Sequence, residues 1–259
     1  MEEGYLNDLW RFEPKLGTNG EWTWMGGCAT VNVGYANQFQ SGCSAVYGAL
    51  KAEGASYPGG RDEETTWTDS TGNFWLFGGY GYDAIGNLGY LNDLWVFFPS
   101  ENQWAWMGGS STTGSNCPLV HENPICGRPG VYGTLGTPAA GNIPGARVNA
   151  NTWTDSSGNL WLFGGYGINS TTVGAGILND LWEFNPSTNQ WAWTSGSSNG
   201  SLYGVYGRQG TAASTNIPGG RFSAVSWSDE SGKLWLFGGI GFDSTGTAGY
   251  LNDLWEYQP

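Results

Sequence analysis

The residues that could do chemistry in this chain are few, and most of them recur. His121 is the single histidine. One histidine cannot complete a zinc site with this cysteine spacing, and no nucleophile-elbow sequence is present to build a Ser-His-Asp or Cys-His set around it. The sequence therefore predicts an exposed loop position for His121. Paired carboxylates for glycoside hydrolysis stay open, because their separation in space cannot be read from sequence.

The four cysteines fall into two local pairs, Cys28 with Cys43 and Cys117 with Cys126. Each pair lies inside one long loop, and neither has the C-x-x-C spacing of a metal site. We predict two disulfides and, because disulfides persist in oxidising compartments, an extracellular, secreted protein. The first residues have neither a basic start nor an apolar core, so no signal peptide is visible.

Acidic residues dominate the charge, with 22 Asp and Glu against 9 Lys and Arg. This excess disfavours nucleic acids, because the chain repels a phosphate backbone. No apolar run is long enough to span a bilayer. Asp83, Asn87 and Asp243 lie near glycines in two related loops and are candidate calcium ligands, with ordinary turn chemistry as the alternative. No other cofactor is predicted.

Four copies of Leu-Asn-Asp-Leu-Trp organise the chain, at positions 6–10, 91–95, 178–182 and 251–255. Such an internal repeat indicates a supersecondary unit that is copied and stacked. The second copy reads as four strands separated by turn sequences, at 65–69, 74–77, 91–98 and 103–107. The third copy contains all four strands. The first copy contains only the third and fourth strands, and the fourth copy contains only the first three strands. These patterns predict an all-β chain of hairpins.

Several polar residues and glycines recur in each unit, which indicates structure rather than catalysis. An aspartate in the repeated motif could cap a turn, and an arginine could pair across units. The aspartates are Asp8, Asp93, Asp180 and Asp253, and the arginines are Arg61, Arg147 and Arg221. The diglycines 78–79, 164–165 and 238–239 open no helix, so they predict a backbone exit with positive φ or a close approach between units. Asp69 to Gly72 predicts a hairpin turn with Gly72 in the left-handed position.

A strand that ends in Gly-Gly, then Asn-Asp-Leu-Trp, then a tryptophan on the next strand resembles the kelch repeat. The resemblance covers nearly every expected strand and implies β-propeller blades, each a four-stranded antiparallel sheet. We expect one kelch-repeat region over 1–259 with about three blades, either a partial propeller or one completed by another chain. The expected blade parts are 1–26, 61–109, 147–195 and 221–259. Long loops join them at 27–60, 110–146 and 196–220.

Two features of this resemblance bear on function. The units are far longer than the kelch repeat of about 50 residues, and we expect the extra loops to be packed over the propeller. Kelch propellers also include galactose oxidase, and that likeness implies a copper site of two histidines and two tyrosines, one tyrosine cross-linked to a cysteine. His121 alone cannot assemble that site.

All 16 tryptophans recur at strand positions, which predicts that most of them form the core between blades. Three of them, Trp67, Trp153 and Trp227, fall on first strands, which line the central channel of a propeller. We treat these three, together with Tyr82 and Tyr166, as candidates for ligand binding.

The connections between second and third strands and between fourth and first strands share one face of a blade. The long loops, the cysteines and the Asp83 and Asp243 loops therefore gather on that face, where loops on a rigid scaffold carry function. We expect a secreted, non-enzymatic interaction or assembly module that acts through this face. Open sheet edges on the end blades invite a protein partner or a second copy. The alternative is a glycan-binding or glycan-processing propeller that uses calcium.

Overall fold

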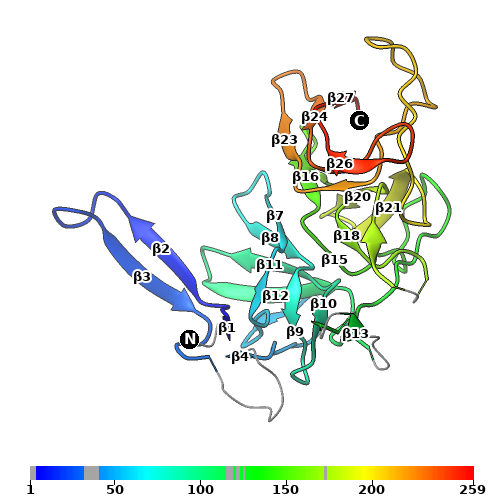
Figure 1. Ribbon diagram of the computed structural model, residues 1–259. Helices are drawn as coiled ribbons and strands as arrows, with labels where there is room; N and C mark the ends of the chain where they lie inside the picture. The colour runs from blue at the N-terminus through cyan, green and yellow to red at the C-terminus, as the bar shows by residue number, and fades with distance from the viewer. Residues whose placement is uncertain (1–3, 32–40, 115–118, 121–122, 125, 172–173) are drawn as a thin grey trace.

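The computed structural model describes residues 4–31, 41–114, 119–120, 123–124, 126–171 and 174–259. Every regular element in these ranges is a β-strand, which confirms the all-β prediction (Figure 1). The described part of the chain contains no helix of the length and apolarity that a membrane crossing needs. Two residues singled out above, Cys117 and His121, lie outside the described ranges.

The expected strands form four successive sheets, which we call blades 1 to 4. Blade 1 is the hairpin of β2 (Leu9–Glu13) and β3 (Glu21–Gly26). Blade 2 contains β7 (Thr65–Thr68), β8 (Phe74–Phe77), β11 (Leu94–Phe98) and β12 (Gln103–Gly108), with β5 (Glu53–Gly54) added beside β12. Blade 3 contains β16 (Asn151–Thr154), β17 (Leu160–Phe163), β20 (Leu181–Asn185) and β21 (Gln190–Ser195). Blade 4 contains β23 (Val225–Ser228), β24 (Leu234–Phe237) and β27 (Leu254–Tyr257).

Small sheets accompany blades 2 to 4, and the sequence patterns did not predict them. The first joins β6 (Arg61–Asp62), β9 (Tyr80–Tyr82) and β10 (Leu88–Tyr90). The second joins β15 (Arg147–Val148), β18 (Tyr166–Gly167) and β19 (Gly176–Ile177), and the third joins β22 (Arg221–Phe222), β25 (Ile240–Phe242) and β26 (Ala248–Tyr250). The segment 80–90, expected as a loop, is therefore a hairpin, because Tyr80 to Tyr82 pairs with Leu88 to Tyr90 around a tight turn. Two further pairs are β1 (Gly4–Tyr5) with β4 (Ser41–Gly42) and β13 (Leu119–Val120) with β14 (Asn123–Pro124).

The first strands of blades 2, 3 and 4 are joined by a ladder of hydroxyl groups. Thr152 Oγ1 donates to the Thr66 carbonyl at 3.2 Å, and Ser226 Oγ donates to the Thr152 carbonyl at 3.1 Å. A second rung runs from Ser228 through Thr154 to Thr68, at 3.2 and 3.0 Å. Because side chains on one side of a strand recur every second residue, a Thr-x-Thr or Ser-x-Ser sequence places both hydroxyls toward the preceding strand.

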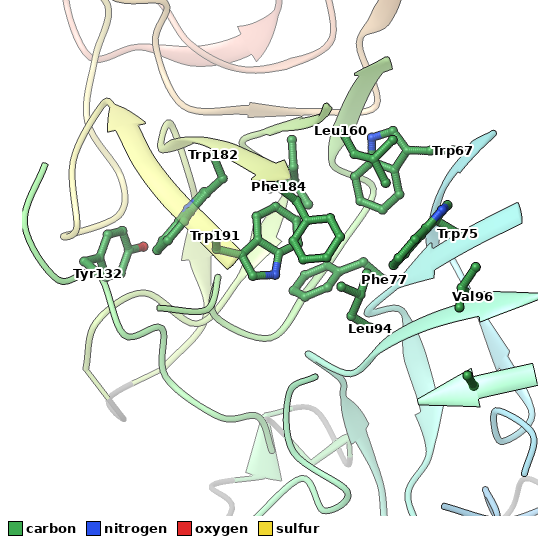
Figure 2. Packing of buried hydrophobic residues seen from close by; sticks show 12 residues of the cluster. Trp67, Trp75, Phe77, Leu94, Val96, Tyr132, Leu160, Trp182, Phe184 and Trp191 are labelled. Carbon is green, nitrogen blue, oxygen red and sulfur yellow. The ribbon is translucent and has the colours of Figure 1, made fainter. Parts of the chain in front are cut away.

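The core lies between blades, as the tryptophan positions predict (Figure 2). We call the surface that a blade turns to the preceding blade its front face, and the opposite surface its back face. The front face of blade 3 consists of Leu160, Leu162, Trp182, Phe184 and Trp191, packed on the back face of blade 2. The back face of blade 3 consists of Trp153, Trp161, Phe163 and Leu181, packed on Leu234, Leu236 and Trp255 of blade 4.

The diglycines make the predicted sharp exits. Gly78 and Gly79 have φ values of 67° and 97°, and the diglycines of blades 3 and 4 repeat these values closely. A Cβ at Gly164 would lie 2.5 Å from the carbonyl oxygen of Arg221, which belongs to the next unit. Both expected reasons for glycine therefore operate at this position, the positive φ and the close approach.

Candidate functional site

The recurring polar residues meet in one buried cluster in each of blades 2 to 4, which we call the arginine cluster. In blade 3, Arg147 donates through two nitrogens to Asp180, each at 2.7 Å, and also to the carbonyls of Gly145 and Gly164. Tyr132 Oη and Trp182 Nε1 both donate to Asp180 Oδ2 at 2.7 Å. The same contacts recur in blade 2 around Arg61 and Asp93, and in blade 4 around Arg221 and Asp253.

The arginine cluster corrects one expectation and confirms another. The arginine pairs with an aspartate of its own blade rather than across blades, because the two are adjacent once the long loop returns to the first strand. The tyrosine of the cluster comes from that long loop, at Tyr47, Tyr132 or Tyr206. Each loop also closes on itself through a short bridge, such as Val131 with Ile143. The described parts of the loops are therefore packed on the blades, as predicted.

Electrostatics in these clusters favours fixed charge. Burial opposes ionisation of Asp93, but the charge and hydrogen bonds of Arg61 outweigh it and lower the pKa of the carboxyl. Burial and the neighbouring carboxylate raise the pKa of Tyr47 well above its ordinary value. Tyr47 therefore stays a neutral donor and Asp93 a charged acceptor at physiological pH, which suits a structural joint rather than proton transfer.

The first-strand tryptophans point between blades rather than into the channel. Trp67 Nε1 donates to the Trp161 carbonyl at 2.9 Å, and Trp153 Nε1 donates to the Trp235 carbonyl at 2.8 Å. Both indoles are buried, and Trp67 lies beside Leu160 of the next blade in Figure 2. Trp227 is largely exposed, since no following blade covers it in the described chain. A ligand could touch Trp67 or Trp153 only after two blades had separated.

A row of aromatic rings runs across the small sheets, and we call it the tyrosine row. Successive ring centroids are 6.0 Å apart from Tyr5 to Tyr80, 5.1 Å from Tyr80 to Tyr90, and 6.1 Å from Tyr90 to Tyr166. The row continues to Phe222. Burial raises the pKa of both Tyr80 and Tyr90 to about 12, with smaller contributions from neighbouring tyrosines and acids. The rings of the row are half-buried, as in a surface that recognises apolar or sugar-like faces.

Two of the candidate ligand-binding residues belong to this region. Tyr166 is a member of the row, and Tyr82 packs edge-on against Tyr5, although Tyr82 itself is buried. The other members of the tyrosine row were not predicted from the sequence. A usable signal was present in the sequence, because Tyr80 and Tyr166 follow the diglycines directly and Tyr90 directly precedes the repeated motif.

The candidate calcium ligands have other partners. Asp83 is fully buried, and its carboxylate accepts the backbone amides of Ile85 and Asn87 and both the amide and hydroxyl of Thr113. Asp243 is half-buried and accepts the hydroxyl of Thr245 and the amides of Thr247 and Thr245, and these hydrogen bonds lower the pKa of its carboxyl. Within the described residues, no three metal-binding side chains come together.

The cysteines follow the predicted local pattern where the structure describes them. Cys28 and Cys43 form a disulfide, which confirms that pairing. Cys126 is also disulfide-bonded, and its expected partner Cys117 lies outside the described residues. The disulfide at Cys28 joins the end of β3 to the segment that leads toward blade 2.

Blades 1 and 4 expose positions that blade 3 buries. Trp10 and Trp22 on the front face of blade 1 are 50% and 65% exposed, whereas their counterparts Trp182 and Trp191 are 0% and 3% exposed. Figure 1 shows β2 and β3 projecting away from blade 2. On the back face of blade 4, the exposed residues are Trp227, Phe237 and Leu254. These tryptophans are exceptions to the core prediction, because no neighbouring sheet of the described chain covers these two faces.

A cavity of about 490 Å³ lies between blade 1 and blade 2. It is lined by Leu9 at the base of the hairpin and by Phe74, Leu76 and Trp104 of blade 2. Phe74 is 44% exposed here, although its counterpart Leu160 is fully buried in blade 3. Residues 6–8, which precede β2, also line the cavity.

A family model and solved structures are similar to this chain. Residues 150–198, which contain blade 3, match the family model described as the Kelch motif. Blade 3 thus carries a kelch motif, and the other blades repeat its strand pattern. No curated protein matches the chain. Among solved structures, that of YjhT is similar, with a TM-score of 0.48 and 14% identity over 98% of this chain. The chain spans 59% of the length of YjhT.

Proposed function

We propose that the protein is a secreted, non-enzymatic interaction and assembly module that binds a protein partner through exposed faces of its kelch-type blades. The observation that carries the proposal is the contrast between Trp22, 65% exposed, and Trp191, 3% exposed, at the same position of the repeat. Large exposed aromatic surfaces such as this one mark interaction sites. The disulfides support an oxidising, extracellular environment.

The recurring charged residues support a structural role for the repeat. Every arginine of the three clusters is committed to an aspartate, and every cluster aspartate to a tyrosine and a tryptophan. The long-loop face was our sequence-based expectation for the partner surface. The tyrosines at positions 47, 132 and 206 of those loops are held in the arginine clusters. We therefore propose the blade faces, in place of the long-loop face, as the main partner surface.

A photo-crosslinking amino acid can test where the partner binds. We would place it at Trp22 on the front face of blade 1 and, as a matched exposed aromatic on a long loop, at Tyr203. Each variant is irradiated alone and with secreted proteins of the source organism, and the adducts are identified by mass spectrometry. We expect polypeptide adducts from position 22 that disappear when Trp10 is changed to Arg. Adducts from position 203 alone would return the function to the loop face.

The tyrosine row favours a second candidate, a glycan-binding propeller. Stacked aromatic rings and nearby hydroxyls suit sugar rings, and Tyr166 and Tyr82 belong to this region. Glycan-array binding that is lost in Tyr90→Ala and kept in Tyr203→Ala would support this reading. Trp67→Ala and Asp83→Ala should act by lowering stability instead, because both side chains are buried. No binding to any glycan removes this candidate.

The second candidate includes calcium as a cofactor, with Asp83, Asn87 and Asp243 as its proposed ligands. A thermal melt with and without a chelator tests it. A lower midpoint in chelator supports an ion in these loops, and an unchanged midpoint excludes it as a stabilising cofactor.

A further inference from the structure

A cavity of about 560 Å³ lies between blades 2 and 3, and no site described above uses it. Its lining includes the end of β12 in blade 2, two aromatic residues of blade 3 and the long loop between the blades, at Met107, Phe184, Trp191 and Ile143. Both blades have all four strands, so the cavity is bounded by complete sheets. Its volume falls within the range of small-molecule sites, about 300–1,000 Å³.

Trp191 brings an unpaired hydrogen-bond donor to the wall of this cavity. The residue is buried, and its indole Nε1 has no hydrogen-bond partner among the described residues. The ring packs on Phe77, Phe184 and Trp182, with ring centroids 5.6, 4.9 and 6.3 Å away (Figure 2). Phenylalanine has no polar side-chain atom and an indole only donates, so none of these rings can accept the proton. The cavity is the open space that borders the Trp191 ring.

Every other buried tryptophan has an acceptor for its indole nitrogen. Trp67 and Trp153 donate to backbone carbonyls of the following blade, and the rest donate to aspartates of their own blade. The rest are Trp75, Trp95, Trp161 and Trp182. A buried donor without an acceptor destabilises a fold, so protein interiors rarely contain one. The exception at Trp191 therefore points to an acceptor that a ligand supplies.

Asn189 adds an unpaired acceptor to the same cavity. Its Nδ2 donates to the Met107 carbonyl at 3.0 Å, which fastens the turn before β21 to blade 2. Asn102 makes the same contact one blade earlier, to the Met25 carbonyl at 3.0 Å. The other amide atom of Asn189, Oδ1, is buried and has no partner among the described residues. One free donor and one free acceptor thus border the cavity, and an amide group can satisfy both.

A positive charge lies at the edge of the cavity. Arg128 is exposed, and its Nε and Nη2 donate to the carbonyl and the hydroxyl of Thr112 at 2.9 and 2.6 Å. These contacts hold the guanidinium in place, and no carboxylate of the described residues forms an ion pair with it. Arginine suits a carboxylate well, because its planar fork offers parallel N–H donors. An anionic group on a ligand would therefore face Arg128.

We propose that this cavity binds a small carboxylic acid with an apolar body and an amide group, the chemistry of an N-acylated apolar amino acid. The amide carbonyl accepts from Trp191, the amide N–H donates to Asn189, and the carboxylate pairs with Arg128. The apolar body contacts Leu94 and Ile143, which also line the cavity. This site is additional to the partner surface proposed above, because it lies between two blades rather than on an exposed blade face.

The indole N–H of Trp191 provides the readout, because its nuclear magnetic resonance signal responds directly to a new acceptor. Trp191→Phe identifies this signal by removing it from the spectrum of isotope-labelled protein. N-acetyl-leucine is the probe, and N-acetyl-leucinamide is the matched compound without the carboxylate. We expect N-acetyl-leucine to shift the Trp191 signal until the site is saturated. The leucinamide should bind at least about threefold more weakly.

Two arginine variants test the charge at the edge of the cavity. Arg128→Gln should raise the dissociation constant of N-acetyl-leucine about threefold or more and leave that of the leucinamide unchanged. Arg208→Gln should change neither, because Arg208 is an exposed loop residue without a side-chain partner in any described contact. Circular dichroism confirms that both variants fold. An equal loss in the two variants would overturn the assignment of the carboxylate to Arg128.

Two results overturn the site itself. One is a Trp191 signal that does not move in about 10 mM N-acetyl-leucine. The other is magnetisation transfer from the Trp191 N–H to water alone in the presence of the probe, because an ordered water molecule then serves as the acceptor. A peptide that ends in leucine separates two sources of the acid. Binding about tenfold tighter than N-acetyl-leucine assigns the end of a polypeptide, and any smaller gain assigns the free acid.

Discussion

At the scale of single residues, three of the nine Lys and Arg residues of this chain are buried in ion pairs. Each guanidinium is fixed by a carboxylate and two backbone carbonyls, so for Arg61 four of the five N–H donors have a protein partner. A buried ion pair with complete hydrogen bonding fixes geometry even where its net contribution to stability is small. The cluster thereby ties a long loop, a first strand and a third strand together in every blade.

Removing one partner of this pair should be severe. Arg147→Met leaves Asp180 buried beside two donors but without its charge partner, and we expect a loss of about 3–5 kcal/mol in the free energy of unfolding. Urea denaturation followed by tryptophan fluorescence measures the loss. Arg208→Ala is the matched control, because Arg208 is an exposed loop residue without a side-chain partner in any described contact. Equal losses in the two variants would contradict a special role for the buried pair.

The same chemistry predicts how stability depends on pH. Burial opposes ionisation of the Asp253 carboxyl. Hydrogen bonds from Arg221, Tyr206 and Trp255 outweigh this effect and hold the pKa of Asp253 at about 2. A folded pKa below the unfolded value of about 3.9 contributes stability above pH 4, and this stability is lost as pH falls toward 2. Denaturation midpoints measured from pH 6 to pH 2 should fall most steeply below pH 4. Asp253→Asn should flatten that fall, and an unchanged slope would refute the assignment.

At the scale of elements, the diglycine exits decide how closely successive units approach. Gly164 combines a φ of 66° with a close neighbour, since a Cβ added there would lie only 2.5 Å from the Arg221 oxygen. Gly136 has a similar φ of 72° but open space around it. The two glycines therefore separate backbone strain from steric conflict.

Alanine substitutions at these two glycines should differ. Gly136→Ala bears only the cost of the left-handed backbone, about 1 kcal/mol. Gly164→Ala adds a clash with a backbone oxygen that cannot rotate away, so we expect at least about 2 kcal/mol more. Chemical denaturation of the two variants side by side measures the difference. Equal destabilisation would show that the approach between units relaxes freely.

Sequence predicted the blade strands well and the small sheets poorly. Runs such as Phe74 to Phe77 are apolar, flanked by turns and copied, so their pairing follows from pattern alone. Strands such as β6 and β15 contain two residues each, too few for any period to be visible. The tyrosine row depends on these strands, so only Tyr82 and Tyr166 were singled out. The arginine clusters were partly predicted, since recurrence shows that a residue is structural but not which residue it contacts.

At the scale of the whole molecule, stability should decline toward the two end blades. Blade 3 is covered on both faces, whereas blade 1 is a hairpin with four large exposed aromatic side chains. In repeat architectures each unit is stabilised mainly by its neighbours, so a unit with one neighbour opens more readily. A single free energy of unfolding therefore describes the chain less well than a profile along it.

Hydrogen exchange can measure this profile. At concentrations too low for self-association, amides of β3 should exchange at least about ten times faster than the equivalent amides of β21. Both strands pair with a third strand in the same register, so the comparison isolates the effect of the neighbouring blades. Equal protection would mean that blade 1 is held by contacts other than blade packing.

The hydroxyl ladder between first strands has a direction. In both rungs the donor belongs to the later strand, from Ser226 to Thr152 and from Thr152 to Thr66 in the first rung. Along this ladder, each first strand offers backbone carbonyl acceptors to the following first strand and hydroxyl donors to the preceding one. A gene that gained or lost one whole unit would keep this donor–acceptor pattern. The number of units in such a chain can therefore change without new substitutions at the contacts between first strands.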